Sequence, residues 1–325
     1  MPVVSQGESA SSHTGAGEWA AIARLRERFS GGTPGPGPDE VWIGDDAAVV
    51  RCPGAHALFA LDLVVEGIHF DLTLGSLADA GWKALAVNVS DIAAMGGRPL
   101  QAVCGVVAPA GTNLEALMDG MGEAATAYAV SLVGGDLSAG RQLVISVAIT
   151  GTTDDRRPVL RSGARPGDAV MVTGPLGSSA AGLASLRDRS GDEGRTGPLA
   201  TAYLRPQARV REGAAAAGGG ATAMIDVSDG LSRDLDHIAR ESAVGIRLDD
   251  VPVSPGATIE QALGGGEDYE LAFTVAPGAI AGLVDRFRQR ELRAPLRIGE
   301  CVADPTVRKI GGADLPIVGW EHKLA

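Results

Sequence analysis

The residues best suited to chemistry in this 325-residue sequence are aspartates that stand near glycine at the ends of apolar runs. Glycine lets the backbone approach a ligand closely, and strand ends often carry binding residues. Carboxylate-rich sets suit hard cations such as Mg²⁺, which commonly join protein carboxylates to substrate phosphates. Without a cation, two carboxylates about 4 Å apart repel by about 4 kcal/mol at an effective dielectric near 20. Six motifs fit this description: IGDDAA (43–48), ALDLVVEGIHF (60–70), NVSDIAAMGG (88–97), LVGGDLS (132–138), MIDVSDGLSRDL (224–235) and GGGEDYEL (264–271).

Each motif also has a simpler explanation. Asp-Gly and Gly-Asp are common turn signals, and Ser228 or Asp229 could cap the helix that follows them. Asp45 and Asp46 are adjacent within VWIGDDAAVV, and successive side chains of a strand point to opposite faces. Both can therefore serve one site only if the strand breaks there, and the pattern alone does not choose between them.

The motif KALAVNVSD gives the strongest argument from pattern alone. Asn88 and Asp91 are three residues apart, so they share one face of a predicted helix. A buried carboxylate needs a partner, which favours a functional role for Asp91. The apolar neighbours that predict burial of this helix are Leu85, Val87, Val89 and Ile92.

Other phosphate signals are weaker. VTGPLGSSAAG (172–182) predicts a strand, a glycine turn and a helix start, where an anion could bind, although a purely structural turn is the more common explanation. Neither a P-loop nor the protein-kinase motif set occurs. His69 follows Glu66-Gly67 in an acidic motif. That context favours a site residue, whereas without it a half-buried strand histidine would be the more common explanation.

The elements that position these motifs alternate along the chain. Helical spacing occurs over 18–29, 76–95, 113–130, 178–187, 231–242 and 278–290, and strand-like runs occur at VWIG, ALFALDLVV, QAVCGVVA, SLVGGD, QLVISVAITG, AVMVTGPLG, AMIDVSDG, VGIRLDD and YELAFTV. The polar, turn-rich passage 151–168 fits a domain boundary. We therefore predict a disordered leader over 1–17 and two α/β-type domains over 18–150 and 151–325.

Composition limits the partners. A formal net charge of −12 argues against nucleic acid or an anionic membrane as the main partner. The start has no signal-peptide pattern, and the longest apolar stretches are too short for a membrane span. Three cysteines, odd in number and without metal-ligand spacing, fit a reducing cytoplasm. We expect a soluble cytoplasmic protein.

Taken in order, nine motifs over about residues 18–325 resemble the thiamine-monophosphate kinase family: IGDDAAVV, LVVEGIHF, WKALAVNVSDIAAMGGRP, GGDLS, VLRSGARPGD, VTGPLGSSAAGL, RPQARV, AMIDVSDGLSRDLDHIARES and LGGGEDYEL. Single motifs are shared with aminoimidazole-ribonucleotide synthetase, selenophosphate synthetase and a hydrogenase-maturation protein. The combination of LVVEGIHF, NVSDIAAMGG, IDVSDGLSRDL and GGGEDYEL is more specific to the kinase.

The resemblance implies an aminoimidazole-ribonucleotide synthetase-like fold of two mixed α/β domains, the first of which binds ATP and Mg²⁺ and pairs through β-sheet in a cytoplasmic homodimer. It implies direct in-line transfer of the γ-phosphoryl group of ATP to thiamine monophosphate, with several Mg²⁺ ions and no general base. The implied metal ligands are Asp46, Asp62, Asp91, Asp136, Asp226 and Asp229. The implied nucleotide contacts are Gly135, Asp136, Arg161 and Ser228, and the implied substrate contacts are His69, Glu267 and Trp320. Asp45 would then cap the turn or orient a neighbour.

The sequence departs from the family at two motifs. Ala60-Leu61-Asp62 stands where Ser-Thr-Asp is usual, and GGDLS stands where GGDTT is usual. These departures affect the expected number of bound metal ions, and not the reaction that the resemblance implies.

Two other hypotheses compete with the kinase. One is another ATP-dependent enzyme of the superfamily. A selenophosphate synthetase would carry a cysteine near a glycine-rich N-terminus, whereas the first cysteine here is Cys52. The other is a non-catalytic maturation or scaffold protein, which the presence of all six aspartates disfavours.

Overall fold

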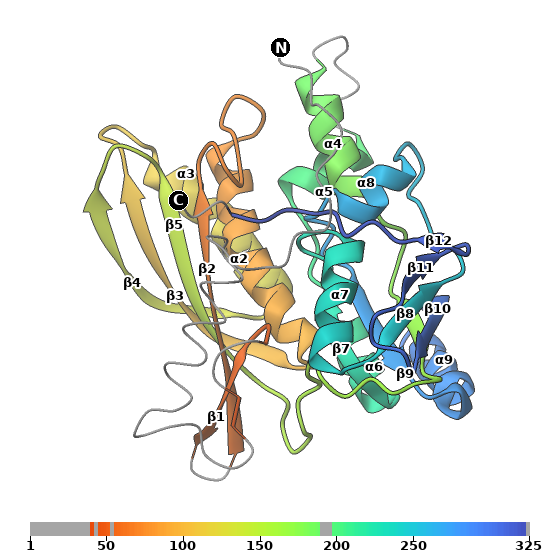
Figure 1. The fold of residues 1–325 in the computed structure, drawn as a ribbon. Coiled ribbons are helices and arrows are strands. Elements are labelled where there is room, and N and C mark those ends of the chain that lie inside the picture. The colour runs from red at the N-terminus through yellow and green to blue at the C-terminus, as the bar shows by residue number, and fades with distance from the viewer. Residues whose placement is uncertain (1–39, 42–44, 53–54, 189–196, 323–325) are drawn as a thin grey trace.

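The computed structural model describes residues 40–41, 45–52, 55–188 and 197–322 (Figure 1). The predicted leader 1–17 and the predicted helix 18–29 lie outside these residues. Among the described residues, the strands form two separate mixed sheets, with helices packed against both. This agrees with the predicted fold class.

The first sheet has the strand order β1-β2-β5-β3-β4. Its neighbours pair antiparallel except β3 and β4, which are parallel. The strands span Ala48–Cys52 (β1), Ala55–Val65 (β2), Arg98–Ala108 (β3), Ser131–Ala139 (β4) and Val144–Thr152 (β5). Helices α2 (Leu77–Ala94) and α3 (Leu114–Tyr128) cover one face of this sheet (Figure 1).

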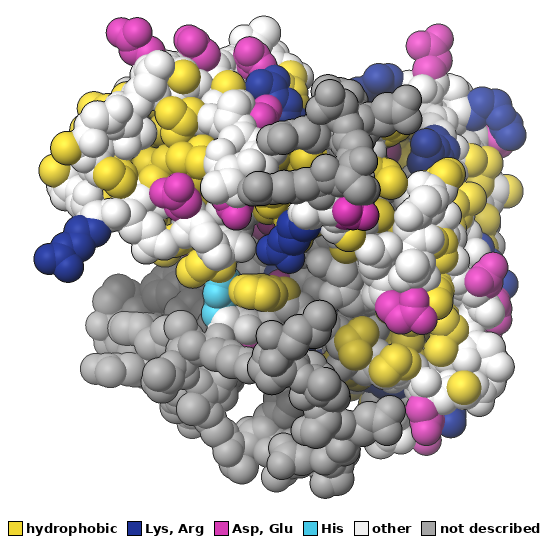
Figure 2. Space-filling model, turned by 90° about the horizontal axis from the view of Figure 1, so that it is seen from above, with side chains coloured by type: hydrophobic (Ala, Val, Ile, Leu, Met, Phe, Trp, Pro, Cys, Tyr) yellow, Lys and Arg dark blue, Asp and Glu magenta, His cyan; other side chains and the backbone are white. Residues whose placement is uncertain are grey.

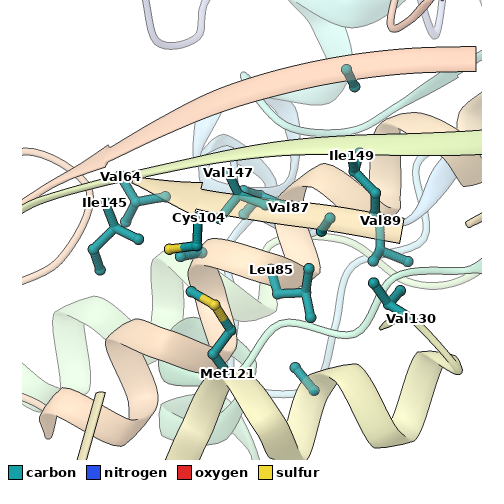
Figure 3. Packing of buried hydrophobic residues seen from close by; sticks show 14 of the residues in the cluster. Val64, Leu85, Val87, Val89, Cys104, Met121, Val130, Ile145, Val147 and Ile149 are labelled. Carbon is teal, nitrogen blue, oxygen red and sulfur yellow. The ribbon is translucent and has the colours of Figure 1, made fainter. Parts of the chain in front are cut away.

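The core of this half lies between the sheet and α2. Period-two alternation in β5 points Ile145, Val147 and Ile149 toward the helix, where they pack with Leu85 and Val89 (Figure 3). Helix α3 packs so closely on α2 that a Cβ at Gly81 would lie 2.0 Å from the Leu117 carbonyl oxygen. Helix α2 is therefore almost entirely enclosed, as its apolar pattern predicts.

The second sheet has the strand order β12-β11-β8-β10-β6-β9-β7. These strands span Ala169–Val172 (β6), Ala221–Asp226 (β7), Gly245–Leu248 (β8), Leu271–Val275 (β9), Leu296–Val302 (β10), Arg308–Ile310 (β11) and Ala313–Asp314 (β12). The helices are α4 (Ser178–Arg187), α5 (Pro198–Leu204), α6 (Val210–Gly218), α7 (Leu231–Glu241), α8 (Ile259–Gly264), the 3₁₀ turn η2 (Pro277–Ala279) and α9 (Ile280–Gln289).

The two halves meet along α2 and α3. Arg205, just after α5, forms ion pairs with Asp79 of α2 and Glu123 of α3. The Trp82 indole N–H donates to the Pro206 carbonyl oxygen at 2.8 Å. Helix α2 also contacts α6 and β7, so one helix belongs to the packing of both halves.

Most predicted elements are confirmed, with differences at three places. The predicted strand VWIG lies mostly outside the described residues; Val41 forms only an isolated bridge to Val49, and the strand here is β1. Helices α5, α6 and α8 and strands β10 to β12 were not predicted. Asp62 and Asp136 lie inside β2 and β4, not at strand ends. The proposed boundary at 150/151 stays a prediction.

Candidate active site

A cavity of about 750 Å³ lies between α2, β2, the end of β7 and the loop that precedes β9. Histidine, hydrophobic and basic side chains gather at the recess seen from above (Figure 2). Ten of the twelve predicted site residues line the cavity: Asp46, Asp62, Asp91, Asp226, Asp229, Arg161, Ser228, His69, Glu267 and Trp320.

Three of the acids form a tight cluster. Carboxylate oxygens of Asp46, Asp91 and Asp226 lie within 4.8 Å of one another. They come from the turn before β1, from α2 and from the last position of β7, so the cluster exists only when both halves are packed together. The Ser90 hydroxyl donates to Asp226 at 2.6 Å.

The electrostatics of the cluster are unfavourable without a cation. Burial, and then the charges of Asp62, Asp226 and Asp46, raise the pKa of Asp91 well above its ordinary value. Burial, and then the charge of Asp46, likewise raise the pKa of Asp226. The protein therefore holds several acids in a place that penalises their negative charge, as expected of a cation site.

Arg161 partly neutralises the cluster. Its Nε and Nη2 donate to the two carboxylate oxygens of Asp46 at 3.0 and 2.9 Å, a bidentate pair that is nearly enclosed. The neighbouring carboxylates hold the pKa of Arg161 above its ordinary value despite burial. A planar guanidinium in this position can also bind a phosphate.

The contacts of Asp45 fit both of its expected alternatives, capping the turn and orienting a neighbour. Its Oδ1 accepts the Asp46 backbone N–H at 2.9 Å, and its Oδ2 accepts the Arg161 backbone N–H at 3.0 Å. Burial, and then the charge of Asp46, raise the pKa of Asp45 to about 7. Asp45 thus ties the first acidic motif to the Arg161 segment.

Asp62 and Asp229 line the cavity beside this cluster. The Asp62 backbone N–H donates to Asn88 Oδ1 at 3.0 Å, which fixes β2 against α2. The backbone carbonyl of Asp229 accepts the Trp320 N–H at 3.0 Å. Asp229 therefore holds the C-terminal segment through its backbone and also presents its own carboxylate to the cavity.

Gly135 and Asp136 do not line the cavity. They stand on β4, the edge strand, where both are exposed. A Cβ at Gly135 would lie 1.9 Å from the Cys104 carbonyl oxygen, so close strand pairing explains that glycine. Their proposed nucleotide contact stays a prediction.

The other end of the cavity is aromatic. The imidazole ring centroids of His69 and His322 lie 5.3 Å apart, and Trp320 stands edge-on to His322 at 5.7 Å. His69 Nδ1 accepts the Val65 N–H at 3.0 Å. Burial lowers the pKa of His69 to about 4, so the ring is neutral near pH 7 and carries its proton on Nε2.

The loop before β9 presents Glu267 through an unusual backbone. Glu267 and Tyr269 adopt positive φ of 56° and 50°, and the Glu267 N–H donates to the Ser228 carbonyl oxygen at 2.7 Å. Gly266 has φ of 69°, and a Cβ there would lie 2.6 Å from the same carbonyl oxygen. These contacts place two acidic motifs, 224–235 and 264–271, side by side.

The glycine turn before α4 is structural. Its first backbone N–H groups donate to Asp268, from Gly177 at 2.6 Å and from Ser179 at 3.1 Å. A carboxylate of the chain already takes the place of an external anion at this helix start.

Several cavity residues were missed: Lys83, Arg187, Tyr203 and His322. Asp234 was missed too; it is buried on α7 and accepts the Gly230 N–H at 3.0 Å. Lys83 stands on the same apolar helix as Asp91, so the reasoning about buried charges could have found it. Arg187 and Asp234 lie on helices that were predicted, but nothing in those patterns marked either residue. Tyr203 and His322 lie in segments that showed no periodic signal.

The paired mixed sheets and the acid cluster between them define an AIR synthase-related protein. Residues 44–153 match the model of the N-terminal domain of AIR synthase related proteins, and residues 165–311 match that of the C-terminal domain. The chain belongs to the thiamine-monophosphate kinase family, as its motifs suggested. It is 45% identical to the thiamine-monophosphate kinase of Mycobacterium tuberculosis over 72% of this chain and 68% of that protein. It is 39% identical to that of Bacillus subtilis over 73% and 78%.

Solved structures agree. A structure described as "AaThiL complexed with AMPPCP and TMP" superposes with a TM-score of 0.80 at 30% identity, covering 97% of this chain and all of that one. The thiamine monophosphate kinase of Aquifex aeolicus gives 0.75 at 29% identity, over 91% and 97%. Hydrogenase maturation proteins at 18 to 19% identity share the fold alone.

Proposed function

We propose that this protein transfers the γ-phosphoryl group of ATP to thiamine monophosphate, giving thiamine diphosphate and ADP. Its curated relatives carry this activity in their names, and one solved relative is described with both AMPPCP and TMP. The observation that carries the proposal is the cavity itself. One end gathers acids from both halves, and the other presents an imidazole, a carboxylate and an indole.

The acid cluster fits Mg²⁺. Asp46, Asp91 and Asp226 supply oxygens alone, within 4.8 Å of one another, and they are hard to keep ionised without a cation. Asp62 and Asp229 line the same cavity and would complete the set. Bound Mg²⁺ would neutralise phosphate charge and hold the two polyanions together.

The nucleotide phosphates would meet Arg161 and Ser228. The fork of Arg161 is already aimed at the acid cluster, and Ser228 lies in the turn between Asp226 and Asp229. An arginine at the transferring phosphoryl group stabilises the charge that develops there.

Thiamine monophosphate would occupy the aromatic end. Trp320 is 52% exposed, so its ring face is available to a cationic thiazolium or a pyrimidine, with a gain of roughly 0.5 to 2 kcal/mol. Glu267 would accept a hydrogen bond from the aminopyrimidine. Neutral His69 would donate from Nε2.

The chemistry needs no general base. The acceptor is an ionised phosphate, so catalysis consists of alignment and charge neutralisation for direct in-line attack. Leu61 and Leu137 replace hydroxyl-bearing family residues, so those positions add no side-chain oxygen here.

A homodimer paired through the first sheet is part of the proposal. The face of this sheet opposite α2 carries exposed apolar side chains on β2 and β3, among them Leu61 at 60% and Val103 at 44% exposure. In β4, Asp136 pairs with Gly105 of β3, which is two residues after the outward Val103, so Asp136 lies on the same face of the sheet as Val103. A second copy on this face would bury the apolar patch and cover the Gly135-Asp136 motif.

The remaining expectations join the proposal. We propose a cytoplasmic enzyme divided into domains at residues 150/151. Among the described residues, no helix is long and apolar enough to cross a bilayer.

Incubation of the purified protein with ATP, Mg²⁺ and thiamine monophosphate tests the proposal. Thiamine diphosphate and ADP should form in equal amounts, and chelation of Mg²⁺ should stop the reaction. Folded protein that binds nucleotide yet forms no thiamine diphosphate would refute it.

A further inference from the structure

A buried lysine lies beneath the aromatic end of the cavity. Lys83 of α2 is 2% exposed and is among the largest fully buried side chains of the described residues. It reaches the cavity from the half of the protein that carries Asp91, on the same helix.

The Lys83 ammonium is saturated by partners. Nζ donates to both carboxylate oxygens of Glu267 at 3.2 Å and to the His69 carbonyl oxygen at 3.1 Å. It also lies 3.9 Å from the centroid of the Tyr203 ring. The Glu267 carboxylate, the His69 carbonyl and the Tyr203 ring thus surround the ammonium.

These partners come from three separate segments. His69 follows β2, Tyr203 belongs to α5, and Glu267 precedes β9. Both acceptor residues are proposed substrate contacts, and Lys83 links them across the two halves of the protein. Removal of Lys83 would leave the Glu267 side chain without this ion pair and the His69 main chain without its tether.

We propose that Lys83 is a positioning residue for thiamine monophosphate: it holds the Glu267 carboxylate and the His69 segment in the geometry that receives the substrate ring. This rests on the proposed function. Each Glu267 oxygen accepts one bond from Lys83 and keeps a second lone pair for a donor on the ligand. Lys83 acts through Glu267 and His69, because its own donors are already engaged.

The test replaces Lys83 by a neutral side chain of similar volume. Lys83→Met should raise KM for thiamine monophosphate by about tenfold to a hundredfold, the range for one charged hydrogen bond. KM for ATP and kcat should stay within about twofold, because the acid cluster is untouched. Lys309→Met is the matched control: Lys309 pairs with Asp314 on the surface and does not line the cavity, so its loss should change none of these values.

A double-mutant cycle separates action through Glu267 from direct contact. If Lys83 works through Glu267, Lys83→Met combined with Glu267→Gln should raise KM little more than Glu267→Gln alone. Independent, additive effects would overturn the proposal. So would a rise in KM for ATP or a fall in kcat alone, since either would place Lys83 on a phosphate.

Two further measurements separate the role of Lys83 from the proposed function and from an effect on folding. Calorimetric titration of thiamine monophosphate without ATP should give a weaker Kd for Lys83→Met than for wild type. Wild type that binds thiamine monophosphate without turnover would contradict the proposed function but not the role of Lys83. Thermal unfolding of Lys83→Met and Lys83→Gln serves as the folding control; if neither variant folds, Lys83 is a structural residue and the proposal fails.

Discussion

Replacing Asp91 by asparagine should have opposite effects on stability and on activity. Asp91 shares the cluster with Asp46 and Asp226, whose oxygens lie within 4.8 Å. At that separation, each pair of ionised carboxylates repels by about 3.5 kcal/mol at an effective dielectric near 20. Asparagine keeps the shape of the side chain and removes the charge.

The net gain is smaller than the summed repulsion. The raised pKa of Asp91 means that protonation already relieves part of it, and Arg161 offsets another part. We expect Asp91→Asn to stabilise the cation-free protein by about 1 to 3 kcal/mol, equivalent to roughly 1.5 to 4.5 °C in Tm for a protein of this size. Differential scanning calorimetry in chelator measures this shift.

Added Mg²⁺ should reverse the difference in stability between wild type and Asp91→Asn. A ligand that binds only the folded state stabilises it by about 2.7 kcal/mol at a concentration of 100 Kd. Wild type should therefore gain Tm with Mg²⁺, and Asp91→Asn should gain much less. Turnover should fall by about a hundredfold or more, as when a charge-stabilising group is lost from a phosphoryl-transfer site.

Asp119→Asn is the matched control because Asp119 is an exposed acid on α3, outside the cavity. It should match wild type in all three measurements. If Asp91→Asn lowers Tm in chelator, or keeps near-normal turnover, then Asp91 is a structural residue and the cation-site reasoning is wrong.

Four further predictions concern other parts of the protein. Arg161→Lys should raise KM for ATP by about tenfold in steady-state assays, because an ammonium cannot reproduce the bidentate fork; an unchanged KM would remove Arg161 from the nucleotide site. Trp320→Ala should raise KM for thiamine monophosphate by about 2- to 30-fold while Trp320→Phe restores most of the affinity; equal losses in both would exclude ring stacking. Val103→Glu should convert dimers to folded monomers in light scattering, since it places a charge on the exposed sheet face; an unchanged mass would contradict pairing through this face. Burial lowers the pKa of His237 to about 3, so the unfolded state binds more protons between pH 6.5 and 3, and His237 should reduce stability as pH falls through that range. Denaturant titrations of wild type and His237→Gln should converge or cross on acidification, and parallel curves would contradict this.

The acid cluster was predictable because two signals coincided in the sequence. Helical spacing placed Asp91 on an apolar helix, and a buried carboxylate needs a partner. The turn after MIDVSD placed Asp226 at a strand end. What pattern could not supply was the meeting of these segments, since strand order and domain packing follow from long-range contacts. The resemblance to the family supplied that step.

Other features depended on information that periodicity does not carry. Pattern alone could not distinguish Asp45 from Asp46, and only the resemblance assigned them different roles. In the structure, Arg161, more than a hundred residues away, binds Asp46 through its side chain and Asp45 through its backbone. Trp320 and His322 lie in a segment without regular structure, held by main-chain and side-chain contacts to the start of α7. Tyr203 lies on the seven-residue helix α5, too short for a clear pattern.

Helix α2 is largely apolar, yet it carries several buried polar side chains. Lys83, Val87 and Asp91 are successive members of an i, i+4 row, and all three line the cavity. Eight residues at 1.5 Å per residue separate Lys83 from Asp91 by about 12 Å along the axis. Lys83 contacts Glu267 and Asp91 belongs to the acid cluster, so one helix reaches both ends of the cavity. A ligand that used both ends would have to span a separation of that order, which α2 fixes because it carries both Lys83 and Asp91.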